Sequence, residues 1–216
     1  MIETIAAVNL QPAVDTLFKY AFLGGALALA LGVLSLFAPR IRGALGEKAV
    51  SRLLRRLPRD NYIVLDDIMI PNNGNTAQID HVVLSPRGVF AIETKNYTGA
   101  IYGSERDSTW VYVKGRYKKK IQNPLRQNYG HIKALQSLLG DDNVHSVVAF
   151  TSGRIKTAMP PNVLRAGQVP DYIRSFRGHP LPLETMERYR HILETANIID
   201  RKSRREHVRG IRQAKR

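Results

Sequence analysis

Asp80, Glu93 and Lys95 are the residues of this chain whose types and spacing best suit chemistry. They lie in the stretch Gln78–Lys95, which reads QIDHVVLSPRGVFAIETK. Two runs rich in β-branched and aromatic residues flank the tetrapeptide SPRG at 85–88, which is typical of a type I turn. The pattern predicts a β-hairpin that carries all three side chains.

The turn decides which residues of the predicted strands 78–84 and 89–95 oppose each other. With 85–88 as the loop, the expected pairs are Leu84 with Val89, Val82 with Ala91, Asp80 with Glu93, and Gln78 with Lys95. The Cβ atoms of direct cross-strand neighbours are about 4.5–5.5 Å apart. Two carboxylates at that distance need a cation, and Mg²⁺ held by carboxylates and water would supply it.

Two other interpretations of the hairpin stay open. Asp80 and Glu93 would lie on a solvated sheet face, with Lys95 as an ordinary ion-pair partner, if they follow the general tendency of charged residues to be exposed. Alternatively, a register slip of one residue would place the two acids on opposite faces. The spacing alone does not choose between these interpretations and a metal site.

Further motifs surround the hairpin in a fixed order: Gly46-Glu47, Gln78-Ile79-Asp80-His81, Gly88-Val89-Phe90, Gly99, Asn123-Pro124 and Gln127. Together with Asp80 and Glu93-Thr94-Lys95, they resemble the nuclease-related domain (NERD) family of the PD-(D/E)XK nuclease superfamily. The resemblance covers about residues 43–150. It departs from the superfamily name in one place, because Ile79 and not a proline precedes Asp80.

The resemblance implies a metal-dependent nuclease that hydrolyses phosphodiester bonds, with DNA as the expected substrate. In such an enzyme Asp80 and Glu93 hold Mg²⁺ or Mn²⁺, and Glu47 adds a ligand or orients the attacking water. Lys95 orients that water or stabilises the pentacovalent phosphate, and Gln127 is a candidate positioning residue. A nucleic-acid-binding module with the same fold but little catalysis, and a membrane-associated interaction protein with a basic surface, remain the alternatives.

Two predicted helices position Glu47 and Gln127. In 43–57 apolar residues recur at helical spacing, and Glu47 borders that stripe, so its carboxylate can lean toward a sheet. Asn123-Pro124 suits the cap and first turn of a second helix, which Gly140 ends. For both polar residues, an ordinary surface position is the alternative.

The remaining elements predict an α/β fold: a mixed central β-sheet flanked by helices, like that of restriction endonucleases. Segment 71–75 reads as a loop, and His81 is expected to be buried and hydrogen-bonded, with metal ligation as the alternative. Further strands are expected at 62–70, Ala100–Tyr102, Trp110–Val113, Arg116–Tyr117, Val144–Phe150 and Val163–Arg165, and a helix within Leu183–Ile199.

The chain is strongly basic, with a formal net charge of +15, which predicts attraction to nucleic acid or an anionic membrane. Candidate nucleic-acid-binding residues are Lys114, Arg116, Lys118, Lys119 and Lys120, with Tyr112 and Tyr117 interleaved. Such a set suits phosphates and stacked bases, or alternatively a basic edge that discourages aggregation. The tail 200–216 would bind nucleic acid or lipid, or be merely solvated.

Residues 20–39 are the expected transmembrane helix, because 21–38 contain no charged residue and the length crosses a hydrocarbon core of about 30 Å. Basic residues follow the segment, whereas only Lys19 precedes it. This asymmetry predicts a single-pass protein of the cell membrane with a cytoplasmic C-terminal domain. A cleaved signal peptide and a buried soluble helix are the alternatives.

The expected organisation has five parts: a short segment at 1–19, the membrane helix at 20–39, a nuclease-related domain at 43–150, its extension at 151–199 and the basic tail. The chain contains no cysteine, which excludes disulfides, zinc–thiolate sites and thiol nucleophiles.

Overall fold

The structure is a computed structural model that describes residues 11–200. The start of the predicted N-terminal segment and nearly all of the basic tail lie outside the described residues. The chain divides into two compact units, 1–42 and 43–216. Helix α1 (Gln11–Leu54) contributes to both units, so the predicted membrane segment and the predicted helix 43–57 belong to one helix.

Among the described residues, the N-terminal unit consists of the part of α1 from residue 11 to residue 42. This helix is long and apolar enough to cross a membrane, judged by length and composition. Its large apolar side chains from Leu17 to Phe37 are exposed, which differs from the core helix of a soluble domain.

The C-terminal unit is built on a five-stranded mixed sheet with the order β1-β2-β3-β7-β9. Strands β1, β2 and β3 are antiparallel, whereas β7 and β9 run parallel to β3. The bounds are β1 (Ile63–Asn72), β2 (Asn75–Ser85), β3 (Gly88–Lys95), β7 (Val144–Phe150) and β9 (Val163–Arg165). The predictions of a mixed sheet and of the last two strands are confirmed.

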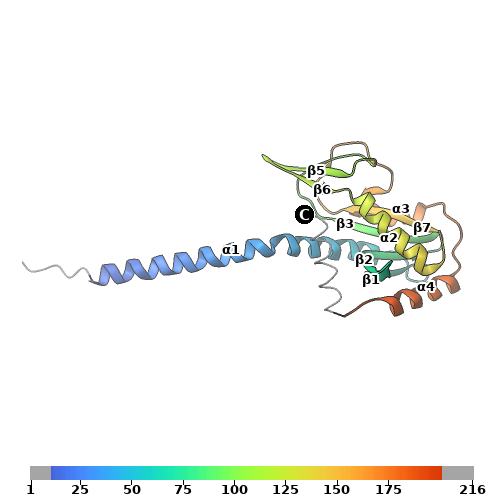
Figure 1. Cartoon of the computed structure of the whole chain (residues 1–216), viewed down its shortest axis with the longest axis horizontal. Coiled ribbons are helices and arrows are strands. Elements are labelled where there is room, and N and C mark those ends of the chain that lie inside the picture. The colour runs from blue at the N-terminus through green and yellow to red at the C-terminus, as the bar shows by residue number, and fades with distance from the viewer. Residues whose placement is uncertain (1–10, 201–216) are drawn as a thin grey trace, which may run out of the picture. The chain divides into compact units, whose positions relative to one another are not determined.

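Helices cover both faces of this sheet (Figure 1). On one face, α2 (Pro124–Leu139) and α4 (Leu183–Ala196) pack on side chains of β1, β2 and β3. On the other face, the last turns of α1 and the short α3 (Val169–Ser175), which follows the 3₁₀ turn η1 (Ala166–Gln168), pack on β2, β3 and β7. Because α1 and α2 lie on opposite faces, Glu47 and Gln127 approach the sheet from different sides.

A second, four-stranded sheet with the order β6-β5-β4-β8 differs from the predicted single sheet. Buried Trp110 joins it to the main sheet by stacking on Phe150, with ring centroids 6.4 Å apart. The bounds are β4 (Ala100–Tyr102), β5 (Thr109–Lys114), β6 (Tyr117–Gln122) and β8 (Arg154–Ile155). The β5–β6 hairpin is longer than predicted and turns at Gly115-Arg116 (Figure 1).

The predicted loop at 71–75 is a tight hairpin between β1 and β2. Asn72 pairs with Asn75, which leaves only Asn73 and Gly74 in the turn. Both have positive φ, 46° and 77°, as a type I′ turn requires. The Asn-Gly dipeptide carries this signal in the sequence, so the loop assignment was wrong for a recognisable reason.

The central hairpin has the predicted register near its turn, where Leu84 pairs with Val89. The ladder ends at His81–Ile92, and beyond it β2 continues only along β1 while β3 continues only along β7. The predicted pairs Asp80–Glu93 and Gln78–Lys95 are therefore wrong. Parting of the strands is favourable here, because two carboxylates directly opposite each other repel.

Candidate active site

The site forms where β2 and β3 part. The freed backbone N–H of Thr94 donates a hydrogen bond of 2.7 Å to Asp80 Oδ2, which replaces the lost ladder contact. Glu93 lies near enough to Asp80 for its charge to raise the pKa of that carboxyl, and it is buried, with 2% of its surface exposed. A carboxylate this deeply buried requires compensation by hydrogen bonds or opposite charge.

Lys95 and residues of helix α2 offset the cost of burying the Glu93 carboxylate only in part. Lys95 Nζ donates to Glu93 Oε1 at 2.5 Å and to Gln127 Oε1 at 3.0 Å. His131, one turn after Gln127, places Nδ1 3.5 Å from Glu93 Oε2. Oε2 nevertheless accepts no hydrogen bond among the described residues, so one buried carboxylate oxygen is left for a further ligand.

The electrostatics of the site follow from several acids near one another. Burial raises the pKa of Asp80 well above its ordinary value, and the charges of Glu93 and Glu47 raise it further. Burial also raises the pKa of Glu47, which feels the charges of Asp67 and Glu93. Without a bound metal ion, the acids therefore keep a proton to a higher pH than separate carboxyl groups would.

Lys95 remains a cation in this setting. Burial alone would lower its pKa, but the charge and hydrogen bond of Glu93, with the charge of Asp80, raise the pKa above its ordinary value. Lys95 is thus a donor of hydrogen bonds and positive charge, and it is a poor proton acceptor near neutral pH.

A series of hydrogen-bonded polar groups leads from Asp66 to Asp80, and the sequence did not point to it. Asp66 Oδ1 lies 2.7 Å from His81 Nδ1, and His81 Nε2 lies 3.2 Å from the hydroxyl of Thr94. Thr94 in turn binds Asp80 through its N–H. The prediction that His81 is buried and hydrogen-bonded is confirmed, whereas no role was predicted for Asp66.

Asp66 also connects this hydrogen-bonded series to the end of α1. Ser51 donates a hydrogen bond of 2.7 Å to Asp66 Oδ2, and Arg55 Nη2 lies 2.6 Å from the same oxygen. The next residue, Asp67, has φ of 53°, an unusual conformation that is often found beside functional sites. Asp67 lies near the acids, because its charge raises the pKa of Glu47.

Asp66→Asn is expected to lower the free energy of unfolding at pH 7 by about 2 kcal/mol. Burial would raise the pKa of Asp66, but hydrogen bonds from His81, Ser51 and Arg55 outweigh it and lower the pKa from 3.8 to about 2. Because the folded-state pKa is depressed, this stabilisation is present above the unfolded value of 3.8 and is lost as the pH falls to about 2. Urea unfolding between pH 2 and pH 7 measures it, and an equal loss at both ends would contradict the assignment.

The donor set of the site is compatible with a hard divalent cation. Asp80 and Glu93 contribute carboxylate oxygens, including the unbonded Oε2, and Mg²⁺ is commonly held by one or two carboxylates with water and substrate phosphates. Within residues 11–200, however, no three His, Cys, Asp or Glu side chains form a ready metal-holding group. The structure thus brings Glu47 into electrostatic range of the pair without completing a three-carboxylate cage.

A comparison with models of protein families shows which family the chain belongs to. The family model of the nuclease-related domain matches residues 42–151, which include Glu47, Asp80, Glu93, Lys95 and Gln127. The chain belongs to the NERD family. This family is part of the PD-(D/E)XK-like nuclease superfamily, so the resemblance stated from the motifs is confirmed.

An uncharacterized protein of Bacillus anthracis is a relative of this NERD protein. It is 35% identical over 178 residues, which cover 79% of this chain and 84% of the relative. No solved structure matches the chain.

The basic residues of the NERD domain separate into two faces of the β5–β6 hairpin. Tyr112 pairs with Lys119 and Lys114 pairs with Tyr117, so these four side chains share one face. The neighbouring pairs, Val111 with Lys120 and Val113 with Lys118, occupy the other face, and Arg116 lies in the turn. The predicted basic set is therefore not a single continuous patch.

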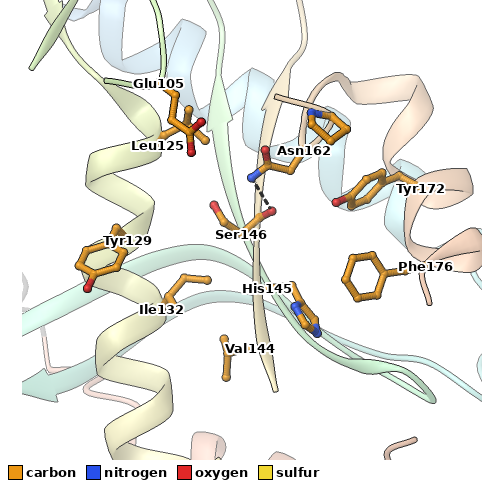
Figure 2. A pocket seen from close by; sticks show the side chains of 11 residues that line it. Glu105, Leu125, Tyr129, Ile132, Val144, His145, Ser146, Asn162, Tyr172 and Phe176 are labelled. Carbon is orange, nitrogen blue, oxygen red and sulfur yellow. Dashed lines mark hydrogen bonds between the residues drawn. The ribbon is translucent and has the colours of Figure 1, made fainter. Parts of the chain in front are cut away.

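A pocket of about 400 Å³ is lined by residues other than Glu47, Asp80 and Glu93 (Figure 2). It opens beside the start of β7, between Leu125 and Tyr129 of α2 and the rings of Tyr172 and Phe176. Two of the lining residues are joined by a hydrogen bond of 3.1 Å, which Asn162 Nδ2 donates to the carbonyl oxygen of Ser146. None of the predicted catalytic residues lines this pocket.

Proposed function

We propose that this NERD protein is a membrane-anchored, metal-dependent nuclease that hydrolyses phosphodiester bonds, with DNA as the expected substrate. The observation that carries the proposal is that Asp80 and Glu93 lie together beside the half-buried cation Lys95, and that Glu93 Oε2 accepts no hydrogen bond among the described residues. Family membership supports a nuclease-related function.

Each residue has a distinct role in this proposal. Asp80 and Glu93 would hold Mg²⁺ or Mn²⁺, which when bound would supply a Lewis acid that activates water and offsets negative charge on the phosphate. Glu47, whose pKa is raised by burial, orients the attacking water or accepts its proton. Lys95, fixed by Glu93 and Gln127, donates to a phosphate oxygen as its charge grows.

The test is cleavage of supercoiled DNA, linear DNA, single-stranded DNA and RNA by the full chain in detergent, with Mg²⁺, Mn²⁺ or EDTA. Asp80→Asn and Glu93→Gln are compared with Asp142→Asn, which removes an exposed carboxylate outside the site. Metal-dependent cleavage that both site variants lose and the control keeps is the expected result. Absence of cleavage with every metal and substrate, or cleavage unaffected by the site variants, would contradict the proposal.

A nucleic-acid-binding module is the second candidate function. The observation that favours it is that Lys95 already binds Glu93 Oε1, while no three acidic or histidine side chains within the described part form a metal-holding group. Binding of DNA that is equal in the wild type and in Asp80→Asn, without any cleavage, would replace the first proposal by this one.

Membrane anchoring rests on the apolar part of α1. We expect the full chain to stay with the membrane fraction after washing at alkaline pH, and the C-terminal domain to be digested by protease only when the cytoplasmic side is exposed. The basis is the excess of basic residues after the span, including Arg40 and Arg42. Release into the soluble fraction would contradict the anchor, and digestion from the opposite side would contradict the orientation.

A further inference from the structure

A row of tyrosines leads away from the acidic cluster, which consists of Glu47, Asp80 and Glu93. Tyr97 follows Lys95 by two residues, and its ring centroid lies 5.1 Å from that of Tyr112. Tyr112 in turn lies 6.2 Å from Tyr117 near the tip of the β5–β6 hairpin. We call Tyr97, Tyr112 and Tyr117 the tyrosine track.

The track begins at the site itself. Burial raises the pKa of Tyr97, while the nearby charge of Lys95 lowers it and that of Glu93 raises it again. Tyr97 and Tyr112 are half-buried, whereas Tyr117 is 57% exposed, so the track becomes more accessible with distance from the acids. Its outer end therefore offers an open aromatic surface.

Lysines alternate with the outer tyrosines on the same face. Lys119 is the cross-strand partner of Tyr112, and Lys114 is that of Tyr117. Both lysines are exposed, and neither forms an ion pair within residues 11–200. The face thus presents aromatic rings and uncompensated positive charges in alternation.

The track is held in a fixed position. On the same face, Trp110 and Ile121 form the next pair inward, and both are buried in the core that joins the two sheets. The Thr98 and Tyr112 hydroxyls lie 3.4 Å apart, which ties the hairpin to the segment after β3. A rigid aromatic surface loses little conformational entropy when a ligand stacks on it.

We propose that the tyrosine track, with Lys114 and Lys119, binds an unpaired nucleic-acid strand and leads it to the acidic cluster, so that the substrate class is single-stranded nucleic acid or a single-stranded end. Stacking on aromatic side chains needs free base faces, which an intact duplex does not offer. Lysines alone would bind the phosphates of either form. The inference rests on the proposed nuclease function for its direction toward the acids.

The test measures binding of the full chain in detergent to a fluorescent single-stranded oligonucleotide and to a hairpin duplex of the same length, in EDTA to prevent cleavage. Tyr117→Leu is expected to weaken single-strand binding by about 5- to 150-fold and duplex binding by less than about 2-fold. The matched control is Tyr102→Leu. Tyr102 is 41% exposed and pairs with Val111, so it lies on the opposite face of the same sheet.

A second pair of variants tests the lysines. Lys119→Gln is expected to reduce the salt dependence of single-strand binding by a slope of about 0.7, the value for one lost phosphate contact. Lys133→Gln, at an exposed lysine of α2 outside the hairpin, is expected to leave it unchanged. Equal effects of the two lysine variants, or of the two tyrosine variants, would overturn the tyrosine track.

The cleavage assay separates this inference from the proposed function. If the protein cuts nucleic acid with metal but Tyr117→Leu behaves like Tyr102→Leu, the track is wrong and the nuclease proposal stands. If Tyr117 controls single-strand binding but no metal supports cleavage, the track stands as a binding site and the nuclease proposal fails.

Discussion

Asp80→Asn is expected to abolish cleavage while making the protein more stable. Asparagine Oδ1 can still accept the hydrogen bond from the Thr94 N–H, so the local structure is kept. The substitution removes one of the charges that, with burial, raise the energy of the ionised cluster. In EDTA at pH 8 we expect a gain of about 1 kcal/mol, or about 2–4 °C in melting temperature for a chain of this size.

The pH dependence of this gain has a definite sign. Because the folded-state pKa of Asp80 is raised, the wild type holds a proton that the unfolded chain releases at lower pH. Wild-type stability therefore falls as the pH rises from the unfolded value of 3.8 through the raised pKa, and Asp80→Asn lacks this fall. Thermal unfolding in EDTA between pH 4 and pH 9 measures the difference. A variant less stable than the wild type at pH 8 would contradict the electrostatic interpretation.

Lys95→Met is expected to slow cleavage strongly and, unlike Asp80→Asn, to lower the stability of the protein. Lys95 Nζ is the cation that contacts buried Glu93, and its removal leaves that carboxylate without a full charge partner. Truncating one member of such a pair costs about 2–5 kcal/mol, and loss of a donor to the reacting phosphate costs about 10²–10³-fold in rate. Lys133→Met is the control, because Lys133 is an exposed residue of the same helix as Gln127.

The effect of a divalent metal on melting temperature distinguishes lost charge from lost packing in Lys95→Met. A bound cation takes over part of the compensation that Lys95 supplies to Glu93, so Mn²⁺ should raise the melting temperature of Lys95→Met more than that of the wild type. A variant that is as stable as the wild type in EDTA would contradict the role of Lys95 as the charge partner of Glu93.

The local parts of the site were predictable from the sequence, because their signals are local. The hairpin around 85–88 and the helix after Asn123 follow from turn and cap residues, and both are found. The end of the β2–β3 pairing at His81 and Ile92 was not predictable, because it depends on the other neighbours of each strand. β1 pairs with β2 and β7 pairs with β3, and β7 lies some 50 residues further along the chain than β3.

The hydrogen-bonded series from Asp66 to Asp80 was not predicted, for a related reason. Asp66 acts through Ser51, His81 and Thr94, which come from three other elements and meet only after folding. The Asn73-Gly74 turn is a different case, since the dipeptide indicates a hairpin by itself. The second sheet required knowledge that β4 pairs with distant β8, which no local pattern contains.

Binding of Mn²⁺ to the full chain, measured by titration calorimetry in two buffers of different ionisation enthalpy, tests the metal site most directly. We expect binding that releases protons, because the cluster holds a proton when no cation is present, and an affinity that rises with pH until the raised pKa of Asp80 is passed. Asp80→Asn and Glu93→Gln should lose this binding, whereas Asp142→Asn should keep it. No binding in the wild type, or equal binding in Asp80→Asn, would contradict the assignment of Asp80 and Glu93 as the metal ligands.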